Sequence, residues 1–196
     1  MIRTKPRFIA FFCALWAFGG SALAGDSPLF SKGTGDAPAG VKQYGQFEGR
    51  WTCAPEYMDS EGNWQILDAR PQWVWHYVLD GAAVQDVWLP DSEKSPPGAA
   101  KGTNLRVYDT ENDEWDMVWT TETSGRFQHF TAKMIEGEIV MRGDIPAGQR
   151  PAHRARITFH NISHEHFDWK YEASSPNGGT QWQLFSSMSC QRDGAS

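Results

Sequence analysis

From Tyr44 onward the sequence consists of short runs of alternating apolar and polar residues, each ended by a turn signal. Such alternation places one face of a strand in a core and the other in solvent. No segment keeps a period of 3.6 residues for the length that a stable helix needs. The pattern predicts about ten antiparallel strands and an all-β fold, either an up-and-down β-barrel or a sandwich. The turn signals are Asp59 to Asn63, Asp80-Gly81, Pro90 to Gly102, Glu111 to Asp113, Ser124-Gly125, Glu136-Gly137, Pro146 to Gly148 and Pro176 to Gly179.

The N-terminal region divides into two segments that precede the strands. Residues 1–24 have the features of a secretory signal peptide, with a basic start, an apolar centre over residues 8–18 and the small-residue cleavage site Ala22-Leu23-Ala24. The apolar run is too short to span ~30 Å of hydrocarbon, which disfavours a membrane anchor. Residues 25–42 are rich in Gly, Pro, Ser and Ala and predict a flexible leader. Residues 43–194 then form one β-barrel domain of a periplasmic or secreted protein.

Two cysteines remain once the signal peptide, which contains Cys13, is removed. In an oxidising compartment Cys53 and Cys190 can pair in only one way, and we expect a disulfide bond between the first and last strands. Two free buried thiols are the alternative.

Composition and charge narrow the class of function. The chain has 11 Phe, 10 Trp and 5 Tyr, which favours a folded domain over disorder. Its formal net charge of -6 argues against nucleic-acid binding, because a basic surface is needed to neutralise phosphates. We therefore expect no nucleic-acid partner.

Counting cross-strand partners from each hairpin turn predicts which side chains share the inner face. If Asp80-Gly81 is a hairpin loop, Tyr77 lies opposite Val84, Trp75 opposite Asp86 and Trp73 opposite Trp88. A four-residue loop from Thr110 to Asp113 sets Tyr108 opposite Trp115 and Arg106 opposite Met117, with Trp119 on the same side. In the last hairpin Phe167, Trp169 and Tyr171 point inward, continued by Trp182, Leu184 and Met188.

This interior is rich in tryptophan and contains two charged residues, Asp86 and Arg106. A charge on an inward face must be paired, so we expect these two to contact each other from adjacent strands. The pair is either a structural ion pair that fixes the barrel register or the polar end of an aromatic cavity. The candidate ligand-binding residues are Trp73, Trp75, Asp86, Arg106, Tyr108, Trp115, Trp119, Arg156 and Trp169.

Several of these residues suggest a family. Gly49-Arg50-Trp51 on the first strand, with Arg192 on the last, resembles the calycin signature, in which a C-terminal Arg covers a first-strand Trp. Calycins include lipocalins, fatty-acid-binding proteins and nitrobindin-like barrels. The runs Gln85 to Trp88, Leu105 to Asp109 and Gly178 to Trp182 look more like an uncharacterised group of bacterial exported lipocalin-like domains. The second lipocalin motif is missing, and the Arg-x-Tyr pair of fatty-acid-binding proteins appears mid-chain. The resemblance implies a barrel that holds a small apolar or amphipathic molecule.

These observations favour an exported lipocalin-like barrel that binds a small hydrophobic or amphipathic ligand, with Arg106 neutralising any carboxylate on it. One alternative is an enzyme in the same barrel with Asp86 as general acid or base. Another is a structural envelope protein with a filled core. We predict no metal and no cofactor, since His164 and His166 lack a third ligand and His76 faces outward in the register above. The register leaves the facing of His160 and Arg156 open.

Overall fold

The computed structural model describes residues 38–96, 98–147, 151–175 and 181–194. The expected signal peptide and most of the expected leader lie outside these ranges. One short helix precedes the strands. The elements are α1 (Lys42–Gly45), β1 (Gly49–Met58), β2 (Trp64–Ile66), β3 (Gln72–Val78), β4 (Ala83–Leu89), β5 (Gly102–Asp109), β6 (Glu114–Thr121), β7 (Gln128–Ile135), β8 (Glu138–Ile145), β9 (His153–His160), β10 (His166–Ser174) and β11 (Gln183–Arg192).

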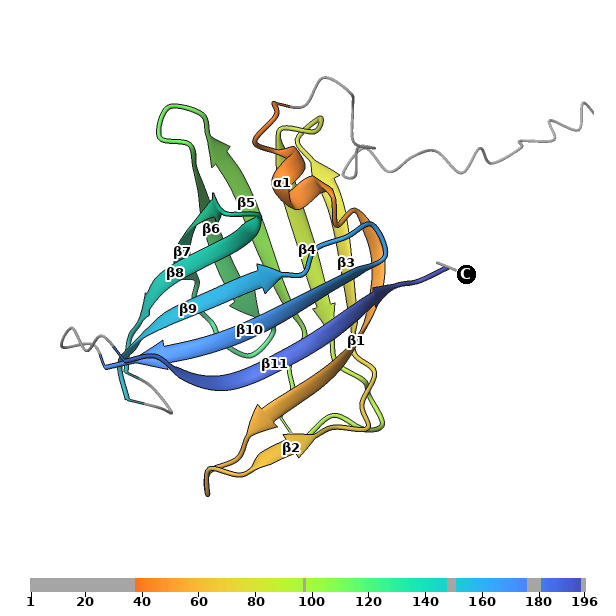
Figure 1. Ribbon diagram of the computed structural model, residues 1–196, viewed down its shortest axis with the longest axis vertical. Coiled ribbons are helices and arrows are strands. Elements are labelled where there is room, and N and C mark those ends of the chain that lie inside the picture. Colours follow the sequence, from red (N-terminus) through yellow and green to blue (C-terminus); the bar gives the residue numbers. More distant parts are fainter. Residues whose placement is uncertain (1–37, 97, 148–150, 176–180, 195–196) are drawn as a thin grey trace, which may run out of the picture.

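The strands form one closed antiparallel barrel, which confirms the all-β prediction. From β3 to β11 each strand pairs with its neighbour in sequence, β3 pairs with β1, and β1 pairs with β11 to close the ring. The three-residue β2 is an addition to this ten-strand barrel and pairs with the second half of β1. Figure 1 shows α1 across one end of the barrel, beside β3, and the β1–β2 hairpin projecting at the other end.

The two predicted hairpin registers are confirmed. Trp73 lies opposite Trp88 and Trp75 opposite Asp86 in the β3–β4 pair, although the strands already end at Val78 and Ala83 and leave a four-residue loop. Leu79, Asp80 and Gly81 all have positive φ in this loop, where glycine is the residue best suited. In the β5–β6 pair Arg106 lies opposite Met117 and Tyr108 opposite Trp115, as expected.

The final strand departs from the predicted alternation. Phe167, Trp169 and Tyr171 point inward as expected, and Met188 continues this face. A bulge between Tyr171 and Glu172 shifts the pairing, so that Ser186 lies opposite Tyr171 while Leu184 lies opposite Glu172. The prediction that Trp182 and Leu184 continue the inner face is therefore wrong. At a bulge, two residues of one strand lie opposite one residue of the partner strand. The inward and outward positions of the bulged strand are therefore exchanged beyond that point.

The N-terminal segment contributes to the core before the first strand begins. Val41 is buried although it falls in the segment 25–42 that we expected to be a leader, and Tyr44 and Phe47 on either side of the end of α1 are fully buried. Close approach fixes this segment, because a Cβ atom on Gly40 would meet the ring of Tyr108 and one on Gly45 the hydroxyl of Tyr77. The ordered domain thus includes residues that composition alone assigns to a linker.

Candidate functional site: an aromatic cavity below a filled barrel end

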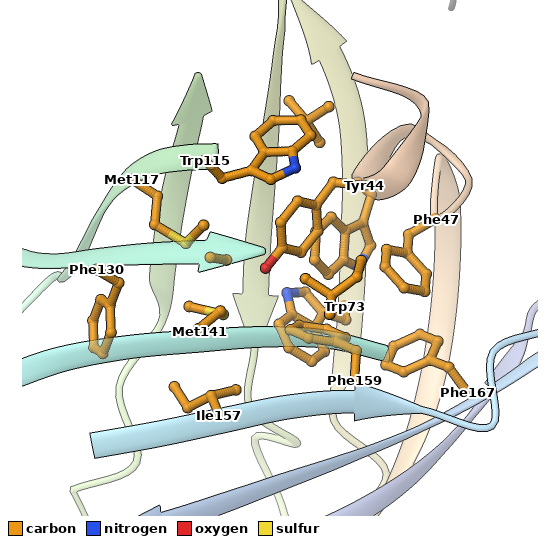
Figure 2. Packing of buried hydrophobic residues seen from close by; sticks show 14 of the residues in the cluster. Tyr44, Phe47, Trp73, Trp115, Met117, Phe130, Met141, Ile157, Phe159 and Phe167 are labelled. Atoms are coloured by element: carbon orange, nitrogen blue, oxygen red, sulfur yellow. The ribbon is translucent and has the colours of Figure 1, made fainter. Parts of the chain in front are cut away.

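Aromatic rings fill the end of the barrel that α1 covers. Figure 2 shows Tyr44 and Phe47 reaching from the N-terminal segment into the interior, where Trp73, Phe159 and Phe167 lie close by. The Tyr44 ring lies edge-on to Trp115, with centroids 4.9 Å apart, and to Phe159, at 5.6 Å. Phe47 packs on Phe167 at 4.7 Å. Tilted and edge-to-face rings at these distances attract each other beyond their burial of apolar area.

The first-strand tryptophan lies at this same end and is covered by an arginine, as the calycin resemblance implies. Trp51 is fully buried, and the Arg192 guanidinium lies 4.3 Å from its ring centroid. Arg192 also donates hydrogen bonds to the backbone carbonyls of Glu48, Gln46 (2.8 Å) and His164 (2.6 Å). One side chain therefore ties the segment after α1 and the β9–β10 loop to β11.

The predicted disulfide bond is present. Cys53 on β1 lies directly opposite Cys190 on β11, with their Cα atoms 4.1 Å apart, and both are fully buried. The bond therefore links the two strands that close the barrel.

Below the filled end the barrel contains a cavity of about 390 Å³. Most of its wall is aromatic or aliphatic, and the polar part comes from β5, β7, β10 and β11. The lining residues are Pro55, Trp73, Trp88, Asn104, Arg106, Trp119, Gln128, Phe130, Met141, Ile145, Ile157, Phe159, Trp169, Tyr171, Ser186 and Met188. Concave apolar sites of this size with a few polar groups are the usual sites of small-ligand binding.

A buried ion pair lies at the polar wall. Arg106 hydrogen-bonds through a guanidinium nitrogen to the carboxylate of Asp86, and Asn104 donates to the two oxygens of the same carboxylate at 3.1 and 3.3 Å. Both charged side chains are almost fully buried. The guanidinium lies 4.5 Å from the ring centroids of both Tyr44 and Trp75, which stack on each other with their centroids 5.9 Å apart. The expected contact between Asp86 and Arg106 is thus confirmed, and it joins the filled end to the cavity.

Tyr44 contributes a hydroxyl group that keeps its proton. Burial raises the pKa of Tyr44 well above its usual value, and the nearby positive charge of Arg106 offsets this only in part. The Arg106 guanidinium lies 4.5 Å from the centroid of the Tyr44 ring. The Tyr44 hydroxyl is therefore protonated at neutral pH and can donate a hydrogen bond.

A second polar pair marks the passage from the cavity to a wider depression at the barrel mouth. The depression, of about 1150 Å³, shares Tyr171 with the cavity and is also lined by Met58, Pro151, His153 and Trp182. His153 Nε2 lies 2.6 Å from the Tyr171 hydroxyl, and its Nδ1 lies 2.9 Å from the Pro151 carbonyl oxygen. Because a carbonyl only accepts, Nδ1 carries the proton of the neutral ring, and the Tyr171 hydroxyl donates to Nε2.

The candidate ligand-binding residues do not all lie at the cavity. Trp73, Arg106, Trp119 and Trp169 line the cavity, whereas Asp86 lies behind Arg106 and Asn104. Trp75 and Trp115 belong to the filled end. Tyr108 packs on Trp115 at 5.2 Å and hydrogen-bonds to Asp113.

Arg156 lies on the outer face of the barrel. It alternates on β9 with Ile157, which lines the cavity, and it donates two hydrogen bonds of 2.8 and 2.7 Å to Glu172. The Trp182 ring stacks on it with a centroid distance of 4.5 Å. His160 shares this outer face, since Phe159 beside it is buried and lines the cavity.

Sequence reasoning missed several cavity residues. Trp88 was placed on the correct face but not in the candidate site, and Phe130 follows from the β6–β7 register opposite Met117. Six more lining residues were not among the candidates, namely Pro55, Asn104, Gln128, Phe159, Tyr171 and Ser186. The rest are aliphatic or sulfur-containing residues at inward positions, which alternation alone does not distinguish from ordinary core. They are Met141, Ile145, Ile157 and Met188.

Comparison with known proteins supports the fold. The S-type phycobiliprotein lyase CPES from Guillardia theta has a similar structure, with a TM-score of 0.50 over 79% of this chain and 93% of that chain, at 9% sequence identity. No protein-family model and no curated protein matches the sequence. The barrel, its closing strands and the Trp51–Arg192 contact define a calycin-like fold.

In the ranges that the structure covers, no group of three or more His, Cys, Asp or Glu side chains is arranged to hold a metal ion. Among the same residues no helix has the length and apolar character to cross a membrane.

Proposed function

We propose that this protein is an exported binding protein that holds a small hydrophobic or amphipathic molecule inside its barrel. The observation that carries the proposal is the 390 Å³ cavity, whose wall combines four tryptophans with the polar group Asn104–Arg106. Aromatic faces supply apolar contact area, and the polar wall orients the ligand. Export is supported by the signal-like residues 1–24 and by the buried Cys53–Cys190 bond, which is typical of oxidising compartments.

The binding site is tested by filling the cavity. Met188→Trp adds a ring to the cavity wall, and we expect it to weaken binding of the neutral fluorophore N-phenylnaphthylamine by about 10-fold or more, since overlap with the ligand must be relieved. The matched control is Leu105→Trp, at an exposed position on the outer face of β5. Fluorescence titration of the three proteins gives the affinities. Equal binding by wild type and Met188→Trp would place the fluorophore elsewhere.

The ligand itself is sought by mass spectrometry. Protein purified from its native host under non-denaturing conditions is denatured, and the released small molecules are compared with those from the Met188→Trp variant. A molecule present only in the wild type identifies the natural ligand.

An enzyme that uses Asp86 as general acid or base is the rival function. Asp86 is fully buried and accepts hydrogen bonds from Asn104 and Arg106. These two residues line the cavity, whereas Asp86 does not. This arrangement favours a partner role for Asp86. The rival predicts that Asp86→Asn lowers turnover of an identified ligand by ~100-fold while binding persists.

A further inference from the structure

Four buried hydrogen-bond donors near the polar wall have no acceptor among the described residues. They are the Tyr44 hydroxyl, the indole N–H groups of Trp73 and Trp75, and the Arg106 Nε–H. Buried polar groups are nearly always hydrogen-bonded, and each unpaired one costs about 1 to 3 kcal/mol. Four in one domain therefore call for an explanation.

The four donors belong to one cluster. The Arg106 guanidinium lies 4.5 Å from the ring centroids of Tyr44 and Trp75, and Trp75 packs on Trp73 at 5.0 Å. Two of the four side chains, Trp73 and Arg106, also line the cavity, where they are 5% and 1% exposed. Two side chains of the cavity wall thus carry unpaired donors, although the donor atoms themselves are covered.

The same wall carries no surplus of charge. Among the described residues that line the cavity, Arg106 is the only Lys, Arg, Asp, Glu or His. It forms an ion pair with Asp86, which lies behind it. Asn104 also directs its amide at Asp86. A carboxylate placed against this pair would add a net negative charge to a buried site, which is unfavourable without a further cation.

We infer that the cavity selects molecules whose buried end is an uncharged hydrogen-bond acceptor, such as the carbonyl oxygen of a ketone or amide on an apolar, ring-containing body. The Trp73 and Arg106 N–H groups are covered in this structure, so binding turns these two side chains toward the cavity, where the carbonyl oxygen accepts from them. The tryptophans cover the apolar body. Asp86 is the residue that discriminates against acids, because it neutralises Arg106. This inference rests on the proposed function and narrows its ligand class.

A matched series of probes tests the inference. Ethylnaphthalene, acetylnaphthalene and naphthoate share one ring system and differ in a hydrocarbon, a ketone and a carboxylate group. By calorimetric titration at neutral pH, we expect the wild type to bind acetylnaphthalene about 5- to 10-fold more tightly than ethylnaphthalene. We expect naphthoate to bind about 10-fold or more weakly than acetylnaphthalene. Equal affinity for the ketone and the hydrocarbon, or tighter binding of the carboxylate, would overturn the inference.

Asp86→Asn tests the source of the selectivity. The variant keeps the shape of the side chain but removes its charge, so Arg106 becomes an unneutralised cation and naphthoate should bind more tightly than acetylnaphthalene. The quantity compared is the ratio of the naphthoate affinity to the acetylnaphthalene affinity, in the variant and in the wild type. A loss of protein stability lowers both affinities of the variant alike and therefore cancels in its ratio. An unchanged preference for the ketone in Asp86→Asn would remove Asp86 as the discriminating residue.

Trp73→Phe provides a test that leaves the charges unchanged. It removes one donor, so the advantage of acetylnaphthalene over ethylnaphthalene should fall about 3-fold or more. Trp88→Phe, on the same cavity wall, should change the affinities for the three probes by a similar factor. An equal loss of ketone preference in both variants would contradict the inference. If none of the probes binds the wild type, the proposed function itself fails, which is distinct from binding without selectivity.

Discussion

The two halves of the barrel interior use the same kind of side chain for different ends. Under α1, Tyr44, Phe47 and Trp115 pack with ring centroids about 5 to 6 Å from their neighbours and are fully buried. Beyond Trp73, the tryptophans at positions 88, 119 and 169 are only partly buried and surround a space. Aromatic content therefore does not distinguish a core from a binding site. What differs is whether another segment supplies the opposing rings.

In the filled half that segment is the N-terminal one. Tyr44 and Phe47 occupy the space between β3, β6 and β10, where their rings contact Trp75, Trp115 and Phe167. No described segment does the same in the other half, where Trp119 on β6 and the paired residues Trp169 on β10 and Met188 on β11 line the cavity. Changes in the filled half should act on stability, and changes in the cavity on binding.

Removal of the disulfide bond should have the largest effect on stability. For a closed loop of 137 positions, the chain-entropy relation gives about 5 kcal/mol as an upper figure for the loss in Cys53→Ala/Cys190→Ala. Urea denaturation of the two proteins measures the difference. Thiol counting on the denatured protein without residues 1–24, which contain Cys13, should find no free thiol in the absence of reductant, and two free thiols would contradict the prediction.

Trp51→Ala should cost ~3 to 5 kcal/mol of unfolding free energy, because it leaves a void in the filled half that its neighbours cannot close. The paired variant Trp88→Ala enlarges an existing cavity at a partly exposed position and should cost only about 1 to 2 kcal/mol. Denaturant titration of the two variants and the wild type measures both losses. A loss below about 1 kcal/mol for Trp51→Ala would undermine the comparison.

Two isoleucines offer the converse experiment. Ile139 is fully buried away from the cavity, so Ile139→Phe should overpack the core and cost about 1 to 3 kcal/mol. Ile157 lines the cavity, and Ile157→Phe should change stability by less than about 1 kcal/mol while weakening binding of N-phenylnaphthylamine. The opposite ranking in thermal unfolding would show that the cavity is as tightly packed as the core.

The smallest effect concerns the outer face. Two hydrogen bonds from Arg156 hold the pKa of Glu172 below its usual value, and burial acts in the opposite direction. This contribution to stability is complete above the ordinary carboxylate value of 4.5 and is lost as the pH falls through the lowered pKa. Since the pair is partly exposed, Glu172→Gln should cost less than about 1 kcal/mol at neutral pH, and wild type and variant should converge in acid. Asp68→Asn, in an exposed ion pair with Lys94 that also lowers the pKa of Asp68, should change the pH profile in the same direction but by less, because solvent screens the pair.

Much of the barrel could be predicted from alternation and turn residues. Asp80-Gly81 and the loop before Glu114 fix two registers, and these placed Asp86 and Arg106 on one face. Alternation, however, predicts whether a side chain points into or out of the barrel, and does not predict its position along the barrel axis. It therefore could not separate Trp75 and Trp115, at the filled end, from Trp73 and Trp119, at the cavity.

Other features have no local sequence signal. A four-residue helix shows no apolar period, so α1 and the burial of Tyr44 were not expected. The bulge opposite Tyr171 follows from pairing with a distant strand, and it moved Trp182 to the outer face, where it stacks on Arg156. Both failures arise because tertiary contacts decide what the local pattern leaves open.

The pairing of β1 with β11 has a consequence for biogenesis. The first strand finds one of its two long neighbours only when residues 183–192 are available, so the ring cannot close while synthesis is incomplete. Contacts so distant in sequence slow folding, and until they form, the aromatic interior is open to water and to other chains. The protein should accordingly need protection from aggregation until its last strand emerges, and it can enclose a ligand only after that moment.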